Sequence, residues 1–320
     1  MTNFLRISAP IVILLLCASC SKEPKEPVLW DQFTRENFNE RYVNSIAVDS
    51  KNNKWFATFG GLLKYDNNQW TVYNKLTGAP CDTLFGMTID SKDKIYCITS
   101  RKNIVCFDGN QWSTIGEGKI YNPTAICTDL NDKLWIAGLS GLYRYDGTIL
   151  SRFYGPTYTN SNYWAMDMAV DANNHVWITA EDSGLVKFDG VKWINYSIKE
   201  SKTNWGYKCL GIDNTGNIWI GGNATGAWKY NGVGFEQFKK DTVPSLYNTT
   251  HCMAFDSKGN AWFGTDKGVL KYHGKIWTTF LDREIDPDPM HYAPVKSLVI
   301  DKNDEVWTTA FGQVYKIFNR

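Results

Sequence analysis

The sequence predicts an all-β protein made of seven copies of one structural unit. Seven times an Asp is followed six residues later by a Trp or Tyr, and successive Asp residues are 39 to 45 positions apart. A period of about 40–45 residues is typical of one four-stranded blade of a β-propeller. We therefore expect a seven-bladed β-propeller of four-stranded antiparallel blades. The repeated pairs are Asp49/Trp55, Asp90/Tyr96, Asp129/Trp135, Asp171/Trp177, Asp213/Trp219, Asp256/Trp262 and Asp301/Trp307.

The third copy shows how one unit divides into strands. Residues 124–129 form a short apolar alternation, which predicts the innermost strand. After a polar turn, the apolar run at 134–138 predicts the second strand. Residues 141–147 predict a third strand that ends in a turn, and 150–153 a short fourth strand. The other copies follow the same order, and no sustained helical period interrupts them.

The two ends of the repeat array complement each other. The seventh copy reaches its third strand at 313–317, and the chain ends three residues later. The segment 30–33 has the aromatic-x-x-aromatic pattern of a fourth strand and precedes the first copy. Pairing it with the seventh blade removes the two open sheet edges of a linear array. The sequence therefore predicts a ring closed by an N-terminal strand that completes the last blade.

The composition limits the function classes. The chain has 34 Lys and Arg against 33 Asp and Glu, a net charge of +1, which suggests neither nucleic acid nor an anionic membrane surface as a partner. Seven blades use almost all of the residues from 28 to 320. That leaves no room for a kinase, a DNA-binding domain or a separate catalytic module.

The first residues resemble an export signal. Arg6 supplies a positive charge, and residues 7–16 are an apolar stretch too short to span a bilayer as a permanent helix. Residues 17–20 resemble a bacterial lipobox, with Cys20 as the lipidated residue; an ordinary signal peptide is the alternative. We expect a signal peptide at 1–19, a lipidated Cys with a polar tether at 20–27 and the propeller at 28–320. Because Ser21 follows the Cys, as in lipoproteins sent to the outer membrane, we expect a lipid-anchored outer-membrane protein facing the periplasm or the cell surface.

The remaining cysteines are expected to be free buried thiols. Cys127, Cys209 and Cys252 occupy small-residue positions of innermost strands, where Cys behaves as a small hydrophobic residue. Two disulfides stay open as alternatives. One joins Cys97 and Cys106, which are expected to face each other in the second blade, and the other joins Cys209 and Cys252. No CxxC or Cys/His spacing typical of a metal site is present.

The second and third strands carry a motif of a known family. The pattern Trp-x-Gly-Thr-x-x-Gly-Leu-x-(Arg/Lys)-Tyr-Asp, seen here at 55–66 and 262–272, resembles the two-component-regulator propeller repeat. Members of that family often form the periplasmic sensor half of hybrid histidine kinases, with oligosaccharides as typical ligands. The resemblance implies the propeller fold and a sensor-like role. The chain differs from that arrangement because it has one propeller, no following β-sandwich and no kinase.

The repeated residues are expected to belong to the framework. An Asp that opens a tight turn accepts hydrogen bonds from the backbone N–H groups that follow it. The turns lack the alternating oxygen ligands and terminal Glu of a calcium loop. The Trp residues of the second strands are expected to pack between blades. Function is therefore sought among residues that break the repeat.

Aromatic residues outside the repeat predict a binding rim. They fall on the face formed by the connections between blades and by the turns between second and third strands, and Trp164 and Trp205 come from successive blades. Aromatic faces stack on sugar rings and form hot spots with protein partners. The alternative is that these residues cover the top of the core. The rim candidates are Tyr163, Trp164, Trp205 and Tyr207, with Tyr121, Tyr158, Tyr247 and Tyr292 also outside the repeat.

Polar candidates lie just inside this rim. The residue five positions before each repeated Asp is expected to ring the channel entrance, and it is Lys208, His251 and Lys296 in the last three blades. One position further along, Asp167 is the only charged residue in a row of small groups, so it must be paired or hydrated. A salt bridge without a ligand role is the alternative. The turns add Arg101, Glu181, Asp182, Asn223 and Asp266.

We expect a non-catalytic, ligand-binding or sensor-like envelope lipoprotein that binds a glycan or a partner protein at the propeller mouth. No cofactor, metal or nucleic acid is expected. One alternative is a lyase or hydrolase that uses His251 and His291. Another is a purely architectural scaffold of an envelope complex.

Overall fold

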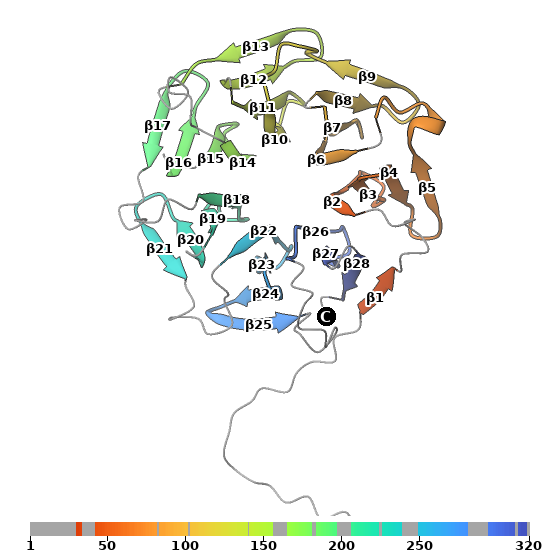
Figure 1. Cartoon of the computed structure of the whole chain (residues 1–320). Helices are drawn as coiled ribbons and strands as arrows, with labels where there is room; N and C mark the ends of the chain where they lie inside the picture. Colours follow the sequence, from red (N-terminus) through yellow and green to blue (C-terminus); the bar gives the residue numbers. More distant parts are fainter. Residues whose placement is uncertain are drawn as a thin grey trace, which may run out of the picture.

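The computed structural model describes residues 42–81, 83–101, 103–139, 141–155, 165–180, 184–196, 206–223, 226–238, 249–280, 294–310 and 313–318, and the backbone of 30–33. These residues form seven four-stranded antiparallel sheets, arranged as a ring around a central axis (Figure 1). The predicted seven-bladed propeller is confirmed. The expected leader and Cys20 lie outside the described residues.

The first four blades follow each other along the chain, and each runs from its innermost to its outermost strand. Their strands are β2 (Val43–Val48), β3 (Lys54–Thr58), β4 (Gly61–Tyr65) and β5 (Trp70–Tyr73); β6 (Leu84–Ile89), β7 (Ile95–Thr99), β8 (Ile104–Phe107) and β9 (Trp112–Ile115); β10 (Pro123–Thr128), β11 (Leu134–Gly138), β12 (Gly141–Tyr145) and β13 (Leu150–Phe153); β14 (Ala165–Val170), β15 (Val176–Ala180), β16 (Gly184–Phe188) and β17 (Trp193–Tyr196). A short 3-10 helix, η2 (Lys75–Thr77), follows β5.

The last three blades continue the ring. Their strands are β18 (Tyr207–Ile212), β19 (Ile218–Gly222), β20 (Gly226–Tyr230) and β21 (Phe235–Phe238); β22 (Thr250–Phe255), β23 (Ala261–Thr265), β24 (Gly268–His273) and β25 (Ile276–Phe280); β26 (Ser297–Ile300), β27 (Val306–Ala310) and β28 (Gln313–Ile317), with β1 (Trp30–Phe33) as the outer strand of the seventh blade.

Strand β1 closes the ring as the sequence predicts. It pairs antiparallel with β28, from Trp30 opposite Ile317 to Phe33 opposite Val314. The order of the seventh sheet is β1-β28-β27-β26, so the first and last strands of the chain share one blade (Figure 1). The edge of β28 is thereby covered by backbone hydrogen bonds.

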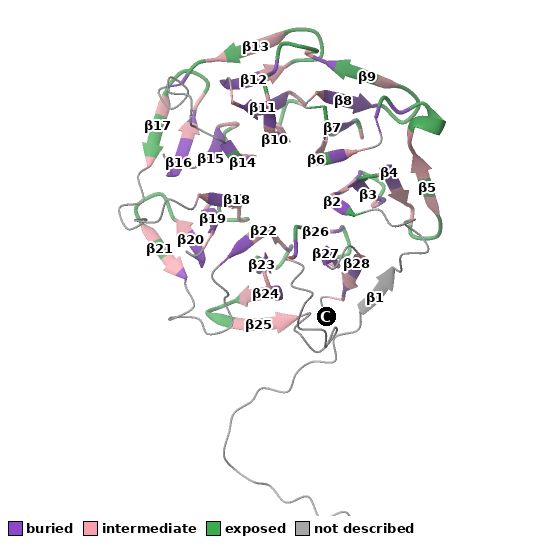
Figure 2. Ribbon diagram, viewed as in Figure 1, coloured by how far each residue is buried: buried purple, intermediate pink, exposed green. Residues whose placement is uncertain are grey.

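The hydrophobic core lies between the blades. In five blades the Trp of the second strand contacts the aromatic residue of the third strand in the next blade: the ring centroids of Trp55 and Phe107 are 6.2 Å apart, and those of Trp307 and Tyr65, across the closing seam, 5.8 Å. Figure 2 shows burial concentrated in the inner and middle strands and exposure in the outer ones. The predicted packing role of the repeated Trp is confirmed.

Each repeated Asp organises its own turn. In the first blade, Asp49 Oδ1 accepts from the backbone N–H groups of Lys51 and Asn53 at 3.0 and 2.8 Å, and Oδ2 accepts from Trp55 Nε1 at 2.9 Å. The same arrangement recurs in the other six blades, with Tyr96 donating through its hydroxyl in the second. The Asp residues are therefore framework, as predicted.

A second position of the same turn ties neighbouring blades together. The residue three after each repeated Asp has a left-handed backbone, and in five blades it is Asn or Asp. Asp93 accepts from the backbone N–H and the hydroxyl of Ser50 in the preceding blade, at 2.7 and 2.6 Å. Asp132 binds Ser91 in the same way. At the closing seam, Asn52 Oδ1 accepts from the backbone N–H of Lys302.

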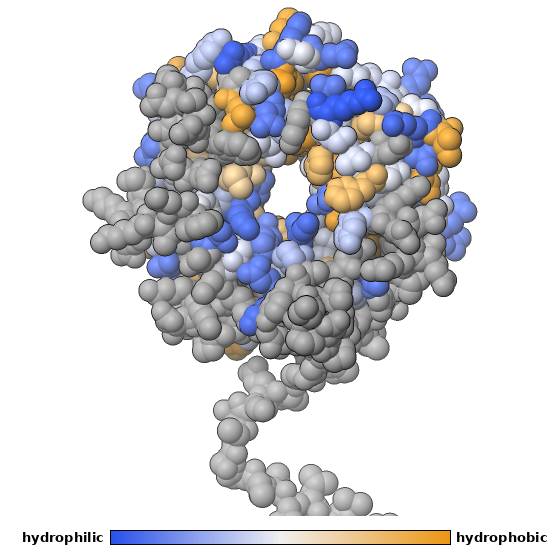
Figure 3. Space-filling view, in the orientation of Figure 1, coloured by the Kyte–Doolittle hydropathy of each residue, from blue (hydrophilic) through white to orange (hydrophobic). Residues whose placement is uncertain are grey.

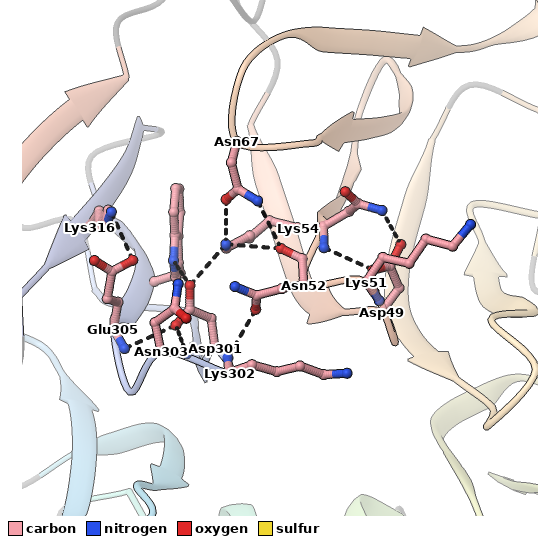
Figure 4. Close-up of polar contacts among 12 residues, drawn as sticks. Asp49, Lys51, Asn52, Lys54, Asn67, Asp301, Lys302, Asn303, Glu305 and Lys316 are labelled. Atoms are coloured by element: carbon pink, nitrogen blue, oxygen red, sulfur yellow. Dashed lines mark hydrogen bonds and ion pairs between the residues drawn. The ribbon is translucent and has the colours of Figure 1, made fainter.

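The closing seam also contains a buried ion pair. Lys54 begins β3, where the other six blades have an apolar residue. Its Nζ lies 2.8 Å from Asp301 Oδ2, and neither side chain is exposed. Nζ also donates to Asn52 O at 3.0 Å and to Asn67 Oδ1 at 2.7 Å (Figure 4). Lys54 thereby links the first blade to the seventh.

The six cysteines in the described part of the chain are free, as expected. The sequence suggested that Cys97 and Cys106 face each other, but Cys97 is opposite Val105 and Cys106 opposite Tyr96. Neighbouring positions of paired strands point to opposite faces of the sheet, and the two thiols belong to different core clusters. The thiols of Cys209 and Cys252 donate to backbone carbonyls of the next blade instead of to each other.

Candidate ligand-binding mouth

The innermost strands are irregular at the end where the channel opens. The pairing register of the innermost strand shifts in six blades, and the shift includes Asn44, Phe85, Thr124, Met166, Lys208 and His251. These are the residues that the sequence places around the channel entrance. A β-bulge re-aims the side chain of its extra residue and is frequent next to binding sites. We call this end of the channel the mouth. The bulges give its residues side-chain directions that differ from those of the regular sheet.

Three consecutive blades place a basic cluster at this row. We define it as Lys208, His251 and Lys296. His251 Nε2 lies 2.6 Å from Oδ1 of Asp266 in the β23–β24 turn; the His side chain is 14% exposed and the Asp side chain 42%. Burial lowers the pKa of His251, Asp266 acts against this, and the charges of Lys208 and Lys296 lower the pKa further. Lys208 and Lys296 thus each lie within electrostatic reach of His251.

Asp167 is paired by backbone N–H groups, and not by the salt bridge that was the alternative. Its Oδ1 accepts from its neighbour Met168 N and its Oδ2 from Leu210 N in the next blade, both at 2.8 Å. Burial raises the pKa of Asp167 to about 6, and the two backbone hydrogen bonds act against this. Ser297, at the equivalent position of the seventh blade, accepts from Ile46 N in the first blade. Asp167 therefore joins two blades, and backbone N–H groups pair it.

An aromatic patch occupies the opposite side of the mouth. We define it as Tyr42, Phe59 and Phe85, which precede β2, follow β3 and begin the bulge of β6. They are 57%, 46% and 38% exposed. The ring centroids of Tyr42 and Phe59 are 5.8 Å apart, and those of Phe59 and Phe85 are 6.1 Å apart with the rings nearly perpendicular. Three exposed, mutually supporting rings offer a ligand apolar surface.

The two groups make the mouth asymmetric. Figure 3 shows an opening at the axis of the ring, with apolar residues gathered on its right-hand rim, over β2 and β6. Hydrophilic residues gather on the left and lower rim, over β18, β22 and β26. Asn44, Thr124 and Met166 complete the row, and Met166 is 36% exposed. The row of channel residues is therefore aromatic or neutral on one side of the mouth and basic on the other.

The other residues predicted from the sequence differ in their positions, and several lie outside the described residues. Tyr207 is 4% exposed and packs in the core between the fourth and fifth blades, which differs from the expected rim position. Arg101 is exposed in the β7–β8 turn. Asn223 Oδ1 accepts from the hydroxyl of Thr249 at 3.2 Å, so it supports the entry to β22. The candidates outside the described residues are Tyr163, Trp164, Glu181, Asp182, Trp205 and, for the enzymatic alternative, His291.

Sequence reasoning missed the aromatic patch. Phe85 belongs to the row of channel residues, but a single Phe in that row was not recognised as part of a site. Tyr42 and Phe59 are 17 positions apart in sequence, and the hydrogen bond from Phe59 N to Tyr42 O brings them together. The sequence could have indicated the patch, because the residue that precedes the first strand of a blade lies beside the turn that follows its second strand.

The described residues show no site for a resident metal. No group of three His, Cys, Asp or Glu side chains among them is placed to hold an ion. Within the same residues, no helix is long and apolar enough to span a bilayer.

Comparison with known proteins supports the fold. No family model matches the chain, and no curated protein does. The extracellular domain of a putative hybrid two-component system of B. thetaiotaomicron matches with a TM-score of 0.72 and 18% identity over 91% of this chain and 40% of that one. A second such domain from the same organism gives 0.75 and 16%, over 92% and 41%. The chain thus spans about two fifths of these extracellular domains.

Two other solved structures match this chain along all or nearly all of their length. Virginiamycin B lyase of Staphylococcus aureus, with quinupristin, has a TM-score of 0.75 and 12% identity, and 92% of this chain covers 100% of that one. YCF48 bound to a D1 peptide has a TM-score of 0.68 and 10% identity, over 91% of this chain and 97% of that one. At these identities the likeness shows a shared fold. The described residues form one seven-bladed propeller, a fold also seen in these extracellular domains, in the lyase and in the peptide-bound protein.

Proposed function

We propose that the protein is a ligand-binding, sensor-like propeller of the cell envelope and that its ligand is a glycan bound at the mouth. The asymmetry of the mouth carries this proposal, because the exposed side chains that break the repeat converge there from the first two and last three blades. Aromatic rings stack on the apolar faces of sugars, while charged and polar groups orient them. The extracellular sensor domains of similar fold support a sensor-like role, and the peptide-bound propeller supports a partner protein as the alternative ligand.

The glycan proposal is tested by thermal shift against a glycan library. A glycan that raises the melting temperature of the wild-type protein should give a smaller shift with Phe59→Ala and with the Tyr42→Ala/Phe59→Ala variant. Val233→Ala is a suitable control, since Val233 is 94% exposed in the β20–β21 turn, away from the mouth. A ligand that binds all variants equally would place the site elsewhere. Trp164 and Trp205 stay predictions for the same rim.

Lipid anchoring at Cys20 in the outer membrane belongs to this proposal. The lipobox-like residues 17–20 support it, as does the extracellular location of the sensor domains of similar fold. Metabolic labelling with a fatty acid should mark the wild-type protein and not Cys20→Ser. A labelled Cys20→Ser protein would contradict the assignment of the anchor.

One observation favours a second candidate function, a lyase. His251 is held at 2.6 Å by Asp266, and its pKa is lowered by burial, so a neutral imidazole is available as a general base. A lyase of the same fold supports this alternative. Turnover of a bound glycan that is abolished in His251→Gln, while binding persists, would favour catalysis over sensing.

A further inference from the structure

The distribution of charge around the mouth is uneven. The row of channel residues is neutral in four blades, with Asn44, Phe85, Thr124 and Met166, and it carries the basic cluster in the other three. Asp266 binds His251, and the carboxylate of Asp167 is engaged by backbone N–H groups. Within the part of the chain that the structure describes, no carboxylate lies within ion-pair distance of Lys208 or Lys296. The charges of Lys208 and Lys296 are therefore not met by an ion pair within these residues.

Both Lys residues act on His251 when the mouth is empty. Lys208 is half-buried and Lys296 exposed, and both disfavour a proton on the intervening His251. Like charges gathered at a partly desolvated site repel one another, and an anion bound among them removes the repulsion while gaining charge-assisted hydrogen bonds. The cluster is thus suited to receive a negative group.

We propose that the glycan bound at the mouth is an acidic one, whose carboxylate or sulfate is bound by Lys208 and Lys296 while a sugar ring lies against the aromatic patch. This inference rests on the proposed function and specifies its ligand. Lys side chains bind an anion as flexible point charges without demanding a bidentate geometry. The aromatic patch distinguishes a sugar-borne anion from a free inorganic one, because only the former buries apolar surface as it binds.

The proposal includes a proton linkage at His251. The groups that face this imidazole are Asp266, which favours its protonation, and Lys208 and Lys296, which oppose it. An anion between the two Lys residues offsets their effect and raises the pKa of His251. Binding then takes up a proton, so affinity for the acidic glycan should increase as the pH falls from the raised pKa of His251 in the complex towards its lowered pKa in the free protein. A His251→Gln variant should lose this dependence.

The experiment compares matched acidic and neutral glycans. Full-length protein in detergent is applied to an array that holds uronic-acid oligosaccharides, sulfated oligosaccharides and their carboxyl-reduced or desulfated counterparts. The wild-type protein should bind an acidic member and not its neutral counterpart, with affinity that falls as salt increases. Lys208→Gln and Lys296→Gln should each weaken binding about tenfold. Lys51→Gln and Lys258→Gln, exposed on the Asp turns at the other end of the channel, are the controls.

Each outcome is decisive. Equal binding of acidic and neutral members would overturn the acidic ligand and leave the glycan-binding function standing. Binding of no glycan would overturn both, and capture of Asp- and Glu-rich peptides in their place would assign the mouth to a protein partner. If a Lys variant fails to fold, the salt and pH dependence of the wild-type protein still decides, since a neutral ligand predicts neither.

Discussion

Replacing Lys54 by Met should weaken the closure of the ring. The Lys54 side chain is fully buried and joins β3 of the first blade to Asp301 of the seventh, with its Nζ 4.9 Å from the ring centroid of Trp307. Met retains much of the apolar volume and removes the charge and three hydrogen-bonding contacts. The substitution therefore isolates the polar contribution of Lys54 to the seam.

The expected loss of unfolding free energy depends on the hydrogen bonds that Asp301 keeps when Lys54 is replaced. Removing one partner of a buried ion pair costs roughly 3–5 kcal/mol, because the other charge stays buried. Asp301 still accepts hydrogen bonds from Asn303 N, Glu305 N and Trp307 Nε1. Equivalent Asp residues in other blades, such as Asp129, have these bonds and no Lys. We therefore expect the lower end of the range, about 3 kcal/mol of unfolding free energy.

The substitution should also change the response to acid. Burial raises the pKa of Asp301, but hydrogen bonds from Lys54 and the backbone, together with the charge of Lys54, outweigh it, so the pKa lies below its ordinary value. A depressed carboxyl pKa stabilises the fold above the unfolded-state pKa of about 4, and this contribution is lost as pH falls below it. Lys54→Met should lose less stability on acidification than the wild-type protein does.

Urea unfolding followed by Trp fluorescence, at pH 7 and below pH 4, measures both effects. Lys187→Met is the matched control, because Lys187 covers the ring of Trp177 at 5.3 Å within one blade. In a double-mutant cycle with Asp301→Asn, the two losses should be less than additive by about 1–3 kcal/mol. A Lys54→Met protein as stable as the Lys187→Met control, with an unchanged acid response, would refute the role of the pair.

Three further changes test the framework. Deletion through Phe33 should lower the melting temperature well beyond a trim that ends before Trp30, since it exposes the edge of β28; equal melts would exclude the closing role of β1. Trp135→Phe should cost about 1–3 kcal/mol, because the 2.9 Å bond to Asp129 is lost inside the core, as urea unfolding will show. Asp167→Asn leaves one of two backbone N–H groups without an acceptor, because an amide has a single acceptor atom. Its net effect on stability should still be more favourable at pH 7 than at pH 4: the pKa of Asp167 is raised to about 6, so ionisation opposes folding above that pH and not below the unfolded-state value of about 4. An equal change in unfolding free energy at both pH values would contradict this assignment.

The blades and their closure were predictable because they depend on periodic features. The Asp-to-Trp spacing of six residues reflects one local geometry, in which a carboxylate binds its turn and the indole of the next strand. The missing fourth strand at the C-terminus and the extra one at the N-terminus were visible because each blade has the same number of strands. The tie through Asp93 was not recognised, since an Asp in a polar turn gives no sign that it reaches the preceding blade.

The mouth was predictable only in part. Lys208, His251 and Lys296 were found because they share one position of the repeat, so their proximity follows from the symmetry of the ring. His251 and Asp266 were both candidates, but their 2.6 Å contact depends on side-chain conformations that the repeat does not specify. Asp167 was expected to need a partner, and a bulged strand of the next blade supplies one through Leu210 N. Such contacts arise from the exact path of irregular backbone, which a propensity pattern does not encode.

The residues that break the repeat separate into two kinds by their surroundings. Lys54 departs from an apolar position, but it is fully buried and its charge is met by Asp301, Asn52 and Asn67, so nothing remains for a ligand to satisfy. Lys208 and Lys296 depart from neutral positions while water still reaches them, and within the described residues no carboxylate neutralises them. A departure of the first kind stabilises the closed ring, and one of the second kind leaves positive charge that an anionic ligand can meet. The basic cluster, and not the closing seam, is therefore where we seek a ligand.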